Sequence, residues 1–292
     1  MIDAHVHLYD PRRPQGVPYP NPANKLIYRP MLPDDLRPVA EPVGITGAVF
    51  VESSPWVEDN QWALDLVANE PYICAIVGNL DPEEESFPAL IERFSRAPLF
   101  RGIRIRQGRP LNFQHPLLPV HLRLLAELGR TLDFAVRTAE LPLVAKLAAA
   151  NPGLKIMVDH LGFVAIDGQV PDADWIKVMS TFESLPNVSC KVSRFTEQAT
   201  TKPAPLEFDR YAPIFDVAWK AFGPDRLTYG SNWPPCLEAG DYCATTTLLR
   251  DYLRERHPSA ASRIMGRNAA SFYGGPRFSV LNRSAVTQVP LA

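Results

Sequence analysis

The stretch LDFAVRTAELPLVAKLAAANPGLKIMVDH, residues 132–160, contains the repeating unit from which we infer the fold. Two short runs rich in apolar and β-branched residues, 132–137 and 154–160, flank a segment with helical periodicity, Leu141–Asn151. The helical segment ends at an Asn-Pro pair, which stops a helix before the next strand begins. A strand, a helix and a second strand in this order favour parallel pairing of the two strands.

The same alternation extends in both directions along the chain. Eight apolar runs recur: MIDAHVH (1–7), GAVFVE (47–52), YICAIVGN (72–79), RGIRIR (101–106), LDFAVR (132–137), LKIMVDH (154–160), VSCKVS (188–193) and RLTYGS (226–231). Helical segments lie between most of them or follow the last: Glu58–Asn69, Glu84–Arg96, Leu117–Gly129, Leu141–Asn151, Asp172–Leu185, Phe208–Phe222, Asp241–Arg256 and Ser259–Phe272. We therefore predict an α/β fold, a distorted (β/α)₈ TIM barrel. An open doubly wound sheet is the alternative, but no glycine-rich phosphate loop follows any strand.

The domain organisation predicted from this pattern is simple. We expect a single barrel domain over residues 1–275, with a proline-rich insertion at 11–40 after the first strand. The last residues, 276–292, have no clear period and are expected to form a C-terminal tail.

Composition excludes several classes of protein. The 292 residues are 46% hydrophobic with a formal net charge of -2, which is typical of a globular domain with a sizeable core. This balance argues against nucleic acid or a membrane as partner. The four cysteines lack metal-finger spacing, and no signal peptide precedes the first strand, so we expect a reduced, cytoplasmic protein. The sequence does not determine the oligomeric state, and a homo-oligomer is one alternative.

Polar side chains stand at the carboxyl ends of nearly all the predicted strands, where the active sites of (β/α)₈ barrels are built. His5 and His7 are two residues apart on one strand and so share a face, as do Arg104 and Arg106. We predict a catalytic group of His5, His7, His160 and Asn232, and a cationic substrate-binding group of Arg104, Arg106, Arg137 and Lys191.

Several motifs together resemble the amidohydrolase superfamily. They are His-x-His (5–7), RGIR (101–104), VDHLG (158–162), CKVS (190–193), YGSNWPP (229–235) and IMGRNAASFYG (264–274). The chain is most similar to the amidohydrolase-related branch, which holds sugar lactonases such as fuconolactonases and the dicarboxylate lactonases. The resemblance implies a hydrolase that acts on a lactone of a small sugar acid or carboxylate. Its expected partner is a small anionic or sugar-derived substrate.

The three histidines suit ester cleavage in two ways. His5, His7 and His160 can polarise a carbonyl by hydrogen bonding, or they can hold one divalent metal ion, Zn or Mn, as a Lewis acid. Both alternatives stay open at this point.

One position departs from the pattern of the resembling family. Asn232 stands where the family has an aspartate that acts as its general acid and base. An amide is not basic, so three alternatives follow. Another carboxylate, from Asp159, Glu52 or Asp241, supplies the base; the protein is a lactone isomerase that acts through a histidine; or it binds a ligand without catalysis.

Overall fold

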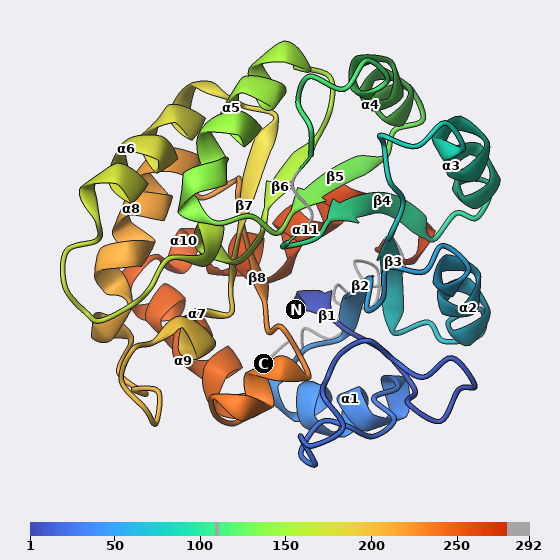
Figure 1. Ribbon diagram of the computed structural model, residues 1–292. Coiled ribbons are helices and arrows are strands. Elements are labelled where there is room, and N and C mark those ends of the chain that lie inside the picture. Colours follow the sequence, from blue (N-terminus) through green and yellow to red (C-terminus); the bar gives the residue numbers. More distant parts are fainter. Residues whose placement is uncertain (109–110, 279–292) are drawn as a thin grey trace, which may run out of the picture.

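Eight parallel strands form one sheet in the computed structural model, which describes residues 1–108 and 111–278. They pair in sequence order. The strands are β1 (Ile2–Val6), β2 (Gly47–Val51), β3 (Ile73–Gly78), β4 (Phe100–Ile105), β5 (Thr131–Phe134), β6 (Ile156–Val158), β7 (Val188–Ser193) and β8 (Leu227–Gly230). Helices surround the strands as an outer ring (Figure 1). The predicted (β/α)₈ barrel is confirmed.

The sheet nearly closes between β8 and β1. Just past β8, the N–H of Asn232 donates to the carbonyl of His5 (2.9 Å), and the N–H of His7 donates to the carbonyl of Trp233 (2.7 Å). A Cβ atom at Gly230 would lie 2.7 Å from Cβ of His5, so glycine permits this close approach. The closure places the ends of β1 and β8 side by side, which brings together sequence positions more than 200 residues apart.

The barrel helices are α2 (Asp59–Leu66), α3 (Phe87–Ser95), α4 (Leu118–Glu127), α5 (Leu141–Ala150), α6 (Ala173–Thr181), α8 (Ala212–Phe222) and α9 (Tyr242–Arg256). Several of them, such as α3, α4, α5 and α8, turn an apolar stripe toward the sheet. In α3 the buried residues Phe87, Ile91 and Phe94 recur at helical spacing, and Phe94 stacks on Phe100 of β4 with ring centroids 5.5 Å apart. In the described part of the chain, no helix is both long and apolar enough to cross a membrane.

The structure differs from the prediction at two segments. The single helix expected over 259–272 is divided into α10 (Pro258–Ser262), a π-helical turn (Arg263–Arg267) and α11 (Asn268–Tyr273). The break lies at Gly266, which packs against the start of β1 and has non-helical backbone angles.

The insertion predicted at 11–40 is also partly regular. It ends in α1 (Pro33–Ala40), which begins with a proline at its first position, where the missing N–H costs no hydrogen bond. A four-residue helix, α7 (Phe195–Gln198), follows β7 directly. Of the tail predicted at 276–292, residues 279–292 lie outside the described residues.

Candidate active site

A cavity of about 370 Å³ opens at the carboxyl ends of the strands. Polar side chains reach it from strand ends all around the barrel, and Tyr19 of the insertion also lines it. Its polar lining from the strand ends includes His7, Glu52, Arg104, Arg106, His160, Arg194 and Asn232. The volume is typical of a site for one small molecule.

Three of these residues have left-handed backbone conformations. The φ angles of His160, Arg194 and Asn232 are 56°, 56° and 62°, and each residue lies just after a strand. Such angles are uncommon in residues other than glycine and cost free energy, so they gather at functional sites. The turn that each makes at the end of its strand places its side chain at the mouth of the barrel.

Hydrogen bonds assign the tautomers of the first two histidines. Nδ1 of His7 lies 3.1 and 3.0 Å from the carbonyl oxygens of Val51 and Glu52, so Nδ1 carries the proton and Nε2 has the lone pair. Nε2 of His7 lies 3.2 Å from Nε2 of His5, and Nδ1 of His5 lies 3.2 Å from Nζ of Lys191. His5 therefore accepts from the ammonium group and donates to His7.

The third histidine is assigned in the same way. Nε2 of His160 lies 3.3 Å from Nη2 of Arg104, which can only donate, and Nδ1 lies 2.8 Å from Oγ of Ser193. The rings of His5 and His160 have centroids 4.4 Å apart. The two histidines therefore lie next to each other, and the catalytic role predicted for them stays a prediction.

Burial keeps all three histidines neutral. Burial lowers the pKa of His7 to about 3, with the charge of Arg104 acting in the same direction. Burial also holds the pKa values of His5 and His160 well below their ordinary value. At neutral pH these imidazoles are weak bases.

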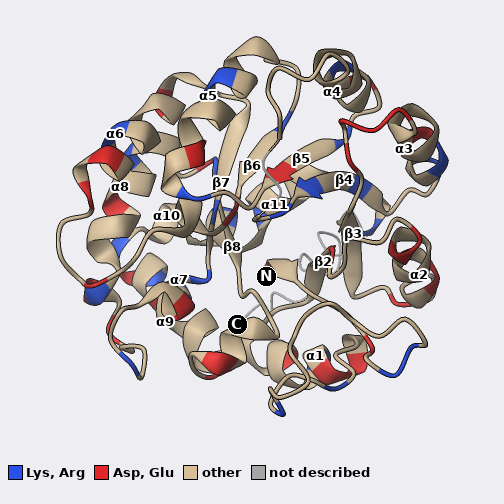
Figure 2. Ribbon diagram, in the orientation of Figure 1, with Lys and Arg blue, Asp and Glu red and all other residues tan. Residues whose placement is uncertain are grey.

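A network of buried charges lies beneath the cavity. Nζ of Lys191 lies 2.7 Å from Oδ2 of Asp133 and 3.0 Å from Oδ1 of Asp159. Arg104 donates from Nε to Oδ2 of Asp159 (2.7 Å) and from Nη1 to Oε1 of Glu52 (3.3 Å). Figure 2 shows charged positions on β4, β5 and β7 inside the ring of helices. With Arg106, whose Nη1 lies 3.2 Å from Oε2 of Glu52, three cations face three carboxylates.

The buried carboxylates respond differently to this network. Burial alone would raise the pKa of Asp159, but the charges of Lys191 and Arg104 outweigh it and hold the pKa well below its ordinary value. Burial raises the pKa of Glu52, and the guanidinium groups of Arg104 and Arg106 offset that rise only in part. Glu52 is therefore the more basic of the two.

The structure does not bring every residue singled out in the sequence to the cavity. His7, His160, Asn232, Arg104 and Arg106 line it, and His5 lies directly behind His7. Lys191 is fully buried in the interior, because it lies within β7 and not at its end. Arg137 is exposed three residues beyond β5, and Asp241 caps the N-terminus of α9. None of these last three is among the described lining residues.

Two charged residues of the site were not found from the sequence. Arg194 lines the cavity, and its Nε donates to no acceptor in the described part of the chain. Glu197, on α7, accepts a hydrogen bond of 2.8 Å from Nδ2 of Asn232. Both follow the predicted seventh strand, in a segment without apolar periodicity, so the only signal was their closeness to the CKVS motif.

The arrangement of histidine and carboxylate side chains shows whether the site suits a metal ion. Ligand atoms of His5, Asp159 and His160 all lie within 4.8 Å of one another, so this group is compact enough to bind a metal. It contains Asp159 in place of the His7 expected from the sequence. However, the lone pairs of both histidines already face the cations of Lys191 and Arg104, as described above. As arranged, these residues do not fit a permanently bound divalent cation.

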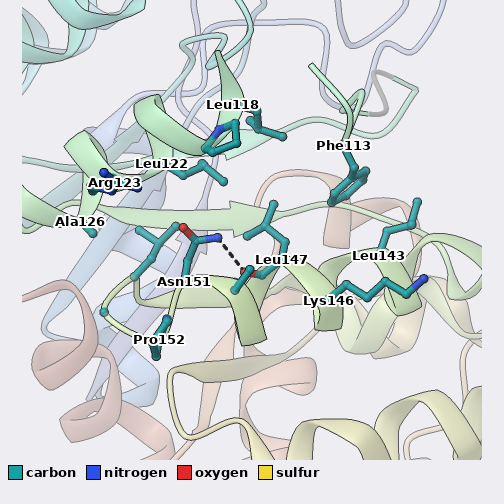
Figure 3. A pocket seen from close by; sticks show the side chains of 14 residues that line it. Phe113, Leu118, Leu122, Arg123, Ala126, Leu143, Lys146, Leu147, Asn151 and Pro152 are labelled. Atoms are coloured by element: carbon teal, nitrogen blue, oxygen red, sulfur yellow. Dashed lines mark hydrogen bonds between the residues drawn. The ribbon is translucent and has the colours of Figure 1, made fainter. Parts of the chain in front are cut away.

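A second hollow, of about 550 Å³, lies between α4 and α5 on the outside of the barrel. Leu118, Leu122 and Leu147 line it, with Arg123 and Lys146 also contributing (Figure 3). Its lining contains no histidine, cysteine or carboxylate among the described residues. The cavity at the strand ends is therefore the better candidate for chemistry.

The chain is similar to known proteins over nearly all of its length. The chain is 31% identical to an L-fucono-1,5-lactonase of Burkholderia ambifaria over 279 residues, which cover 93% of this chain and 94% of the relative. A solved amidohydrolase from Burkholderia multivorans with bound Zn is 26% identical, has a TM-score of 0.81, and is matched over 94% of this chain and 99% of its own.

A third similarity concerns the fold alone. The solved structure of a probable 2-pyrone-4,6-dicarboxylic acid hydrolase from Acinetobacter baumannii, with citric acid bound, is 16% identical. It superposes with a TM-score of 0.74 over 94% of this chain and 98% of its own. The profile of the amidohydrolase family matches residues 2–275, and with the barrel and its strand-end site this shows that the chain belongs to the amidohydrolase family.

Proposed function

We propose that the protein hydrolyses a lactone, a cyclic ester of a small sugar acid or carboxylate. The observation that carries the proposal is the cavity at the strand ends, where neutral histidines and three guanidinium groups surround space for one small ring. The identity of 31% to a lactonase supports the same class of reaction. Hydrolysis of a lactone produces a carboxylate, for which guanidinium groups are suitable partners.

The guanidinium groups differ in their availability to substrate. Arg104 already contacts Asp159, Glu52 and His160, so we assign it a structural role as an ion-pair partner. Nη1 of Arg106 lies 3.2 Å from Oε2 of Glu52, an ion pair without hydrogen-bond geometry, and Nε of Arg194 donates to no described residue. Arg106 and Arg194 are therefore the residues that we expect to bind the carboxylate and the oxyanion formed from the lactone carbonyl.

Glu52 is the proton acceptor in this proposal, because it is the one carboxylate among the described lining residues. A water molecule attacks the carbonyl carbon while its proton passes to Glu52, and a tetrahedral oxyanion forms. The ring C–O bond then breaks, and the proton is transferred to the departing alkoxide. The low pKa of His7 makes that imidazole a poorer acceptor.

A panel of lactones tests the proposed function directly. Purified protein is incubated with L-fucono-1,5-lactone, D-glucono-1,5-lactone and 2-pyrone-4,6-dicarboxylate, and acid release is followed at constant pH. We expect turnover of at least one lactone. Absence of turnover with all three, together with a higher melting temperature in the presence of one, would support the non-catalytic binding alternative.

Arg194 provides a test of substrate binding. Replacing it with methionine is expected to raise KM about tenfold with a smaller change in kcat, since the guanidinium contacts ground state and product alike. Steady-state kinetics measures the effect. Arg123→Met, in the hollow between α4 and α5, is the matched control and should leave both constants unchanged.

Metal removal tests the electrostatic argument. Because Lys191 and Arg104 already face the candidate ligands, we expect kcat/KM after dialysis against a chelator to stay within about twofold of the untreated value. A loss of more than about tenfold that Zn or Mn restores would show that the ion displaces these cations and takes part in the reaction.

A further inference from the structure

The side chain of Asn232 donates a hydrogen bond to a carboxylate that is not among the described residues lining the cavity. Nδ2 of Asn232 donates to Oε1 of Glu197 at 2.8 Å, and the other oxygen of Glu197 accepts from Oγ1 of Thr196 at 3.1 Å. Both carboxylate oxygens are therefore engaged. Glu197 is not among the described lining residues, whereas Asn232 is.

This contact determines which end of the Asn232 amide faces the cavity. A carboxylate only accepts hydrogen bonds, so Nδ2 must point toward Glu197 and Oδ1 must point away from it. Oδ1 of Asn232 accepts no hydrogen bond from the described residues and is not among their fully buried unpaired atoms. Without Glu197 the amide could turn over at little cost, because its oxygen and nitrogen are nearly equal in size.

The rest of the lining is rich in donors. The guanidinium groups of Arg104, Arg106 and Arg194 can only donate, so they cannot satisfy a hydroxyl proton of a substrate. A sugar-acid lactone carries several hydroxyl groups, each of which needs an acceptor when it is removed from water. A neutral acceptor oxygen at Asn232 meets this need without adding a charge next to Glu197. An aspartate there would place two carboxylates in contact.

We propose that Glu197 is a positioning residue that orients the Asn232 amide, so that Oδ1 accepts a hydrogen bond from a hydroxyl group of the substrate. The pair makes the site selective for hydroxylated lactones over lactones that lack hydroxyl groups. This inference rests on the proposed lactone hydrolysis and specifies its substrate class.

The test compares two lactones with the same ring size, L-fucono-1,5-lactone and unhydroxylated δ-valerolactone. Glu197→Ala is expected to raise KM for the hydroxylated lactone about tenfold and to leave the constants for δ-valerolactone within about twofold. Glu197→Gln should restore most of the affinity, because its Oε1 still accepts from Asn232 while Nε2 faces the Thr196 hydroxyl. Glu255→Ala, which removes an exposed carboxylate of α9, is the matched control.

The outcomes separate the two proposals. If the wild-type protein hydrolyses neither of these lactones nor any lactone of the panel above, the proposed function is wrong, and the role proposed for Glu197 is wrong as well. If the wild-type protein is active but Glu197→Ala leaves the preference between the lactones unchanged, lactone hydrolysis stands and the inference is overturned. Equal losses on both lactones would assign Glu197 a purely structural role and would overturn it as well.

Discussion

Replacing Glu52 with glutamine is expected to lower kcat/KM for lactone hydrolysis by about 10²–10⁴-fold, the usual contribution of a positioned acid or base. Glutamine has nearly the same shape and keeps one acceptor oxygen for Arg104, but it cannot take a proton from water. Asp159, the other carboxylate beneath the site, also has cations beside both oxygens, as Glu52 does, but its pKa is held well below its ordinary value whereas that of Glu52 is raised, so Asp159 is the weaker base.

The pH profile distinguishes a base from a structural partner. Because burial raises the pKa of Glu52, kcat/KM of the wild-type protein should fall as pH decreases through a value above the ordinary glutamate pKa. This acid limb should disappear in Glu52→Gln. Glu58→Gln, at the exposed start of α2, is the control for the removal of a carboxylate. A Glu52→Gln variant that is folded and retains the wild-type rate would exclude Glu52 as the proton acceptor.

The sequence was sufficient to predict the barrel and the positions of most strand ends. Strands such as β7, predicted and observed at 188–193, are short apolar runs bounded by turns, and this pattern depends on local residues. Once the barrel is assumed, residues at the ends of different strands must meet at one rim. The closeness of His5 and His160, which are far apart in the chain, follows from that geometry.

The roles of the charged residues could not be predicted from the sequence in the same way. Alternation along a strand indicates that Lys191 points into the barrel, but it does not indicate how deep the side chain lies. Arg137 follows β5 by three residues, where the direction of the chain is no longer set by the strand. Glu197 contacts Asn232 because Arg194 adopts a left-handed conformation and caps the four-residue helix that contains Glu197. A helix this short has no periodic pattern by which the sequence could predict it.

Replacing Lys191 with methionine is expected to lower the free energy of unfolding by about 3–5 kcal/mol, as measured by chemical denaturation. Methionine has a similar length, so little packing is lost. The ammonium group, however, is the cation beside Asp133 and contacts Asp159 as well, and both carboxylates are fully buried. Among the described residues, its removal leaves Asp133 with only the hydroxyl groups of Tyr273 and Thr131 as side-chain hydrogen-bond partners. Lys220→Met, at an exposed position of α8, should change the free energy by less than about 0.5 kcal/mol.

A second substitution separates the loss of charge balance from the loss of packing. In Lys191→Met, Asp159 keeps Arg104 as its cation, whereas Asp133 has lost its own. Adding Asp133→Asn removes that uncompensated carboxylate, so the double variant should be more stable than Lys191→Met alone. Asp133→Asn by itself should be destabilising, because Lys191 would then have Asp159 as its remaining carboxylate partner. If the changes in the free energy of unfolding of the two single variants instead sum to that of the double variant, Asp133 and Lys191 do not stabilise the fold through their mutual contact. The buried charges would then serve only to orient His5 toward His7, since Lys191 donates to His5 whether or not the charge pair stabilises the fold.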